Sequence, residues 1–158
     1  MKYIINKIKT LNNYDKAMII ISFLGLIPFI LGLLDLYYNK GNTYIKINIP
    51  INYGVIILTF IGSIYWGILL GSKERFPYND NIKIITLIWS IIPSFLGILI
   101  LIIEEKNSLI ILSFSYLICQ LVDEIYYKFS IFKTMYIYLR RILTFIVIAV
   151  FILSYSII

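Results

Sequence analysis

Two charged side chains lie within otherwise apolar sequence. Asp123 falls near the end of one apolar segment, and Arg140 falls just before the next. A carboxylate inside a bilayer is unfavourable unless it is paired or hydrated, and a guanidinium can bind it through two hydrogen bonds. We therefore predict an Asp123–Arg140 pair that joins the two segments, either as a tie between helices or as part of a polar site. The candidate polar cluster also includes two aromatic residues expected at the same depth, Tyr65 and Trp66.

Other chemistry-bearing residues are scarce. The chain has no histidine, which removes the commonest metal ligand and the usual general base. Cys119 is the single cysteine, so no internal disulfide is possible. Asp123 and Glu124 are adjacent and should point to different helix faces, a poor geometry for paired acid–base work. Walker, H-E-x-x-H, CxxC and G-x-S-x-G motifs are missing from the sequence. We expect no catalytic residue, metal site or cofactor, and hence no enzyme.

The apolar segments that carry these residues are long enough to cross a bilayer. Of the 158 residues, 61% are hydrophobic, and the mean hydropathy is +0.93, which is too apolar for an ordinary soluble domain. About 20 residues of helix span the ~30 Å hydrocarbon core. The sequence predicts one all-α, polytopic membrane domain over 1–158, a bundle of five transmembrane helices. The expected spans are 17–38, 51–71, 82–103, 108–127 and 142–158, with a basic surface segment at 1–16 and an amphipathic basic loop at 124–141.

The basic residues predict an orientation. Eleven of the fourteen lysines and arginines fall on the side of the N-terminus if there are five spans. Because cytoplasmic loops carry the excess of Lys and Arg, we expect the N-terminus inside and the C-terminus outside. The net charge of +6 is then an orientation signal, and no nucleic-acid partner is expected. The richness in Ile, Lys, Asn and Tyr suggests an AT-rich genome, which favours a bacterial inner membrane or, if organellar, the mitochondrial inner membrane.

Small residues recur at every fourth position of the second span. They form one ridge on a helix, where a second helix could approach closely; this candidate packing ridge consists of Thr59, Ser63, Gly67 and Gly71. A second small face on the third span (Ser90, Ser94 and Gly97) is a plausible mate. Pro93 lies between these residues near the middle of the span, where it is interpreted as either a structural kink or a hinge.

The chain also resembles a known family. The second span reads YG-x-x-IL-x-F-x-G-x-x-x-WG, and a Pro-Ser pair, an Asp and an LR-x-x-LT sequence follow. These are Tyr53, Gly54, Leu58, Phe60, Gly62, Trp66, Gly67, Pro93, Ser94, Asp123, Leu139, Arg140, Leu143 and Thr144. The pattern is similar to the membrane proteins grouped with transmembrane protein 69 (domain of unknown function 3429). The family usually has His where this chain has Tyr65, so a proton-transfer or metal role there could not operate unchanged. The resemblance implies a five-helix inner-membrane protein without an established activity.

Two functions fit these observations. The first is a non-enzymatic structural, assembly or accessory component that acts through helix–helix contacts. The alternative is a small transporter or channel, as a monomer or homo-oligomer, with a Pro93 hinge. Its path would be lined by Ser63, Ser90, Ser94, Ser113, Gln120 and Asp123. The expected partners are the lipid bilayer and either another membrane protein or a second copy of the chain.

Overall fold

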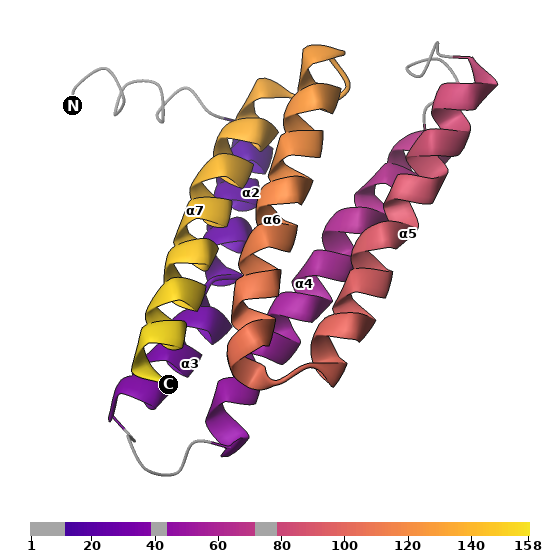
Figure 1. Cartoon of the computed structure of the whole chain (residues 1–158). Helices are drawn as coiled ribbons and strands as arrows, with labels where there is room; N and C mark the ends of the chain where they lie inside the picture. The colour runs from indigo at the N-terminus through magenta and orange to yellow at the C-terminus, as the bar shows by residue number, and fades with distance from the viewer. Residues whose placement is uncertain (1–11, 39–43, 72–78) are drawn as a thin grey trace.

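Every regular element in the described ranges of the computed structural model is an α-helix. These ranges are 12–38, 44–71 and 79–158; most of the expected surface segment 1–16 lies outside them. The helices are α2 (Asn13–Leu24), α3 (Ile27–Tyr38), α4 (Tyr44–Gly71), α5 (Asp80–Ile102), α6 (Glu105–Lys128) and α7 (Thr134–Ile157). They lie side by side as an up-and-down bundle (Figure 1). Five segments within the described ranges are long and apolar enough to cross a membrane, because α2 and α3 together form the first. The predicted five-span helical bundle is confirmed.

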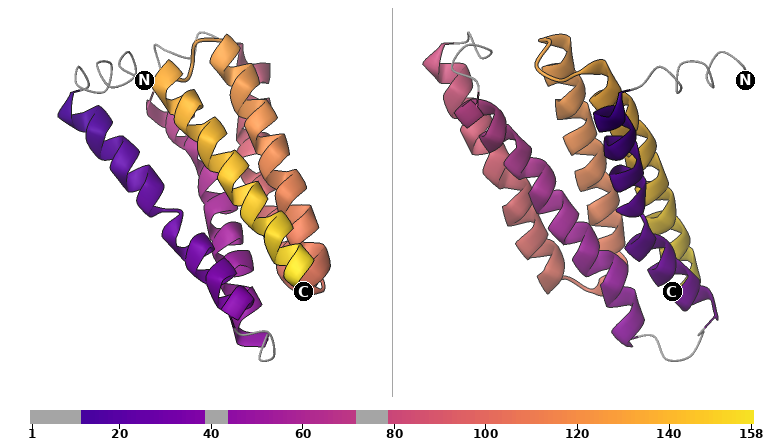
Figure 2. Two further views of the ribbon diagram at one scale, coloured as in Figure 1. Left: turned by 90° about the vertical axis from the view of Figure 1, so that its left-hand side faces the viewer. Right: turned by 180° about the vertical axis from the view of Figure 1, so that it is seen from behind.

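The first span breaks where proline enters it. Pro28 has no N–H to donate to the preceding turn, and the chain tightens there, since the Leu26 N–H bonds to the Phe23 carbonyl three residues back. The two halves also differ in burial. α2 has no buried residue, whereas α3 buries Phe29, Gly32 and Leu36. Figure 2 shows α2 leaning away from the rest of the bundle while α3 approaches it.

The core forms where α3, α4, α6 and α7 meet. Phe151 of α7 is fully buried, and its ring lies 5.6 Å from those of Phe29 and Tyr116. The Tyr116 hydroxyl donates a 2.9 Å hydrogen bond to the Gly54 carbonyl of α4. Gly54 permits this approach, because a Cβ there would lie 2.9 Å from the Phe151 ring. Phe151 of α7 thus packs against three other helices, α3, α4 and α6.

α5 packs mainly on α4 through a stripe of small residues. Its buried residues are Thr86, Ser90, Pro93, Gly97 and Ile100. A Cβ at Gly62 would lie 2.6 Å from the Ser90 carbonyl oxygen, and a Cβ at Gly97 would lie 2.8 Å from Val55. The small face predicted on the third span is therefore a packing face. α5 is continuous through Pro93, which is buried beside Gly62.

One predicted boundary needs correction, and one helix extends beyond its predicted span. The amphipathic loop expected at 124–141 is mostly helical, because α6 continues to Lys128 and α7 begins at Thr134. A tight turn suffices between them: Ser130 adopts a φ of 60°, and its N–H bonds to the Tyr127 carbonyl. The predicted second span, 51–71, agrees to within two residues with the apolar segment Ile49–Gly71. The helix that contains it, α4, begins earlier, at Tyr44, and includes Pro50.

Candidate functional site

The candidate site is built by three helices near one end of the bundle. Asp123 lies five residues before the end of α6, and Arg140 lies six residues after the start of α7. At 1.5 Å per residue, both are less than about 10 Å from the α6–α7 turn. Tyr65 reaches them from α4. All three side chains are buried, and Asp123 has an exposed fraction of 0%.

Each carboxylate oxygen of Asp123 accepts a hydrogen bond from a different helix. The Arg140 Nε donates to Oδ2 at 2.8 Å, and the Tyr65 hydroxyl donates to Oδ1 at 2.6 Å. Hydrogen bonds to an ionised group are shorter and stronger than neutral ones, and exclusion of water strengthens them further. The structure thus brings together the predicted Asp123–Arg140 pair and adds Tyr65 as a direct partner. The carboxylate ties α4, α6 and α7 at a single point.

Aromatic rings enclose this polar group. The Tyr65 ring packs edge-on against Tyr126 at 4.8 Å and Phe132 at 5.9 Å. Phe132 in turn stacks on Tyr136 at 4.8 Å. The guanidinium is less completely hydrogen-bonded than the carboxylate, because Arg140 Nη2 is buried without a partner among the described residues. The buried Tyr136 hydroxyl also has no hydrogen-bond partner among them. The rings exclude solvent from the tie.

A second ion pair lies beside the first and was missed from the sequence. Arg141 binds both carboxylate oxygens of Glu124 at 2.6 Å. Gln120 donates to Glu124 at 2.9 Å, and Thr144 donates to Gln120 at 3.3 Å. The available signal was the spacing, since two adjacent acidic residues are followed 17 residues later by two adjacent arginines. Because each acidic residue is 17 residues from an arginine on the next helix of the hairpin, this spacing predicts two ion pairs between α6 and α7.

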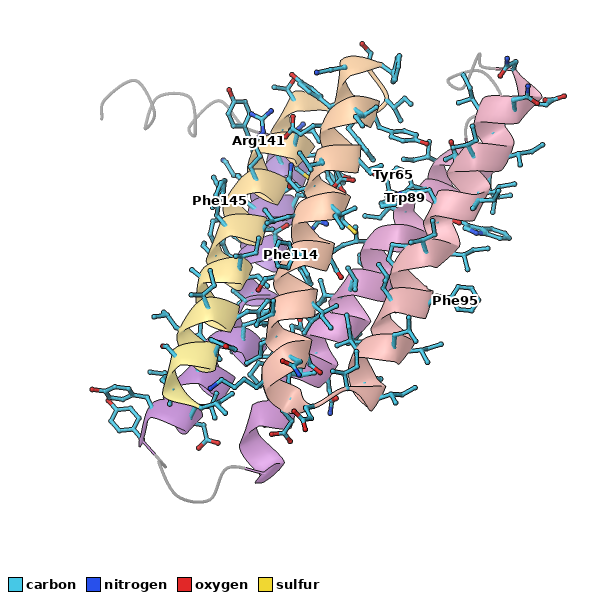
Figure 3. All side chains as sticks on the ribbon, viewed as in Figure 1. Tyr65, Trp89, Phe95, Phe114, Arg141 and Phe145 are labelled. Atoms are coloured by element: carbon cyan, nitrogen blue, oxygen red, sulfur yellow. The ribbon has the colours of Figure 1, made fainter. Side chains whose placement is uncertain are left out.

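A hydrogen bond close to the polar cluster also connects α5 to α6. Thr86 of α5 and Tyr126 of α6 share a hydrogen bond of 2.7 Å. Thr86 is fully buried and Tyr126 is partly buried, so this contact is partly shielded from the surroundings. In Figure 3, Tyr65 and Trp89 lie in the region between α6 and α5, whereas Phe95 and Phe145 project outward on opposite sides.

Trp66 and most of the predicted packing ridge lie elsewhere. Trp66 is 45% exposed and does not join the polar cluster. Ser63, Gly67 and Gly71 are exposed, and Thr59 is only partly buried. A Cβ at Gly67 or Gly71 would meet no described atom within 4 Å. The expectation that this ridge mates with the third span is wrong beyond Thr59.

Helix geometry explains the correction. Successive residues of an α-helix are rotated by about 100°, so residues two apart point to roughly opposite sides. Tyr65 points inward to Asp123, and Ser63 and Gly67 each lie two residues from it. They must therefore point outward. The inward small residue of this part of α4 is Gly62, which the ridge prediction did not include.

The arrangement favours a structural tie over acid–base chemistry. Both Asp123 oxygens are occupied by donors, and both Glu124 oxygens bind Arg141. Within the described ranges, no group of three His, Cys, Asp or Glu side chains is placed to hold a metal ion. A carboxylate that is already bound on both oxygens is poorly placed to accept a proton from a substrate.

Replacing Tyr65 with Phe should destabilise the bundle by about 1–2 kcal/mol, because Asp123 loses a charge-assisted hydrogen bond. Tyr116→Phe is the matched control. It removes a hydroxyl that binds a neutral carbonyl, so a smaller loss of about 0.6 kcal/mol is expected. The free energy of unfolding can be measured by SDS titration in mixed micelles, followed by circular dichroism. Equal losses in the two variants would contradict a special role for the Asp123 contact.

Fold and site together define a multi-pass helical membrane protein whose spans are tied by buried polar contacts. The chain belongs to the family described as "Protein of unknown function (DUF3429)", which matches residues 14–156. The expected link to transmembrane protein 69 within that family is not tested by this match and stays a prediction. No curated protein and no solved structure matches the chain.

Proposed function

We propose that the protein is a non-enzymatic assembly or accessory component that acts through helix–helix contacts. Its expected location is the bacterial inner membrane, or the mitochondrial inner membrane if it is organellar, with the N-terminus inside and the C-terminus outside. The observation that carries the proposal is the outward face of α4. We call this surface the open α4 face: Phe60, Ser63, Gly67, Leu70 and Gly71.

The open α4 face combines small residues with exposed large ones. Phe60 is 64% exposed and Leu70 is 76% exposed, while a Cβ at Gly67 or Gly71 would meet no atom of the described residues within 4 Å. Small residues allow two helices in a bilayer to approach closely and gain van der Waals contact. A ridge of this kind on the outside of the bundle fits a helix of another membrane protein.

The polar site supports this surface. Tyr65 fixes the rotation of α4 about its axis, because its hydroxyl is bound to a carboxylate that is itself bound to α7. Since Ser63 and Gly67 lie on the opposite side of the helix from Tyr65, the same contact holds the open α4 face outward. In this proposal the site acts by positioning a surface.

The test is a pull-down of the tagged protein from its native membrane in mild detergent, with quantitative mass analysis. We expect one foreign membrane protein at near-stoichiometric amount. Gly67→Leu should reduce its recovery at least tenfold, because the bulky side chain would separate the two helices. Phe145→Leu is the control, since Phe145 is an exposed residue of α7. Recovery of the chain only as a monomer or homo-oligomer would contradict the accessory role and favour the transporter.

The described residues do not favour the transporter. Ser63 is exposed on the outside of α4. Ser90 of α5 is buried in the contact between α5 and α4. The hydroxyls of Ser90 and Ser113 donate to carbonyls of their own helices. Ser63 and Ser90 therefore do not line a common path, which supports the accessory role over the transporter.

A further inference from the structure

A groove opens between α6 and α7 near the end of the bundle that holds the α5–α6 turn. Its volume is about 230 Å³, and its lining is almost entirely apolar. The lining residues include Leu109, Ser113 and Leu117 of α6 and Ile148, Ile152 and Tyr155 of α7. Figure 3 looks onto this side of the pair, where Phe114, another lining residue, is labelled.

The dimensions of the groove suit a hydrocarbon chain. Leu109 and Leu117 are eight residues apart on α6, which corresponds to about 12 Å along the helix. One leaflet contributes roughly 15 Å of a hydrocarbon core that is ~30 Å thick. The groove therefore runs along most of the depth of one leaflet, and its apolar walls offer nothing to a polar ligand.

A positive charge lies at one end of the groove. The Lys106 ammonium sits 4.9 Å from the centroid of the Tyr155 ring, and Tyr155 lines the groove. Lys106 is the second residue of α6, so it lies at the level where a span leaves the hydrocarbon. Glu104 and Glu105 lie in the same turn, but it is the lysine that is held over the groove wall. This places a cation at the depth of lipid phosphates.

We propose that the groove binds one acyl chain of an anionic phospholipid, whose phosphate contacts Lys106. The chain fills the apolar space between α6 and α7, and the ammonium selects the headgroup. The lipid then covers the part of the α6–α7 hairpin that lies away from the two ion pairs. This inference is independent of the proposed function, since the open α4 face lies on a different helix.

The test measures lipids retained by the purified full chain in native mass spectrometry, after exchange into nanodiscs of phosphatidylglycerol or phosphatidylcholine. We expect one retained phosphatidylglycerol and roughly fivefold less phosphatidylcholine, the preference that one basic side chain gives at an anionic membrane surface. Lys106→Ser should remove this preference. Lys128→Ser, an exposed lysine at the other end of α6, should leave it unchanged.

A second variant tests the acyl-chain position. Ser113→Leu should fill the groove and lower retention of both lipids, whereas Ser156→Leu, which alters an exposed serine that does not line the groove, should not. Circular dichroism confirms that each variant is folded; if Ser113→Leu is not, Lys106→Ser decides the matter alone. Equal retention of the two lipids by the unmodified chain, or an unchanged preference in Lys106→Ser, would overturn the proposal.

Discussion

Replacing Arg140 with Gln is expected to destabilise the protein by about 3–5 kcal/mol, because Asp123 would remain as a buried charge without its cation. The carboxylate is fully buried, so it cannot recover hydration without separating the helices. Tyr65 would still donate one hydrogen bond, but it carries no charge. The expected observation is a large fall in the melting temperature in detergent, with a matching fall in the free energy of unfolding.

Two comparisons isolate the pair. Arg141→Gln removes the neighbouring ion pair, whose arginine is far more exposed than Arg140, and should change stability little. The double variant Asp123→Leu with Arg140→Met replaces both charges with apolar groups, and should recover most of the lost stability. If Arg140→Gln and Asp123→Asn each leave the melting temperature unchanged, the pair does not hold the helices together.

Gly62→Ala is expected to separate α4 from α5 and to destabilise the bundle by about 1–3 kcal/mol. The new Cβ would lie 2.6 Å from the Ser90 carbonyl oxygen and 3.1 Å from the Pro93 ring. Neither group can move aside alone, since one is backbone and the other is a ring closed on backbone. The whole of α5 must shift, which also loosens the close contact of Gly97 with Val55.

Gly67→Ala, on the same helix, gives the opposite expectation. Its Cβ would meet no described atom within 4 Å, and alanine favours a helix over glycine by up to about 1 kcal/mol. The variant should be neutral or slightly stabilised when the free energy of unfolding is measured for the purified chain. A loss in Gly67→Ala as large as that in Gly62→Ala would show that α4 is rotated from its position in this structure.

The ion pair was predictable because a charged side chain within a bilayer needs either an oppositely charged partner or water. Asp123 needs a cation at its own depth, and Arg140 was available on the next span. The direction of the small-residue ridge was not predictable in the same way. α4 carries small residues on both sides, Gly54 and Gly62 on one and Ser63, Gly67 and Gly71 on the other, and helical spacing alone does not say which side faces the bundle.

The inward side is set by a contact far away in the sequence. Tyr65 and Asp123 are 58 residues apart, and their contact, together with the close approaches at Gly54 and Gly62, fixes the rotation of α4. Helix ends were also predicted less well than spans. Polar and basic residues at 124–141 suggested a loop, but their hydrogen bonds to one another allow both helices to continue past the apolar region.

The order in which the chain is made gives the α6–α7 hairpin a further meaning. Asp123 leaves the ribosome 17 residues before Arg140, which corresponds to about 1–3 s at the usual rate of synthesis. During that interval α6 carries a carboxylate whose cation does not yet exist. The ion pair closes a loop of only 17 residues, so it forms from local contacts soon after α7 appears, whereas the bond from Tyr65 spans 58 residues and requires α4 to find a hairpin already assembled. Neutralisation of the carboxylate therefore depends on α7, and a chain in which α7 has not been made has an unpaired Asp123 carboxylate within the membrane.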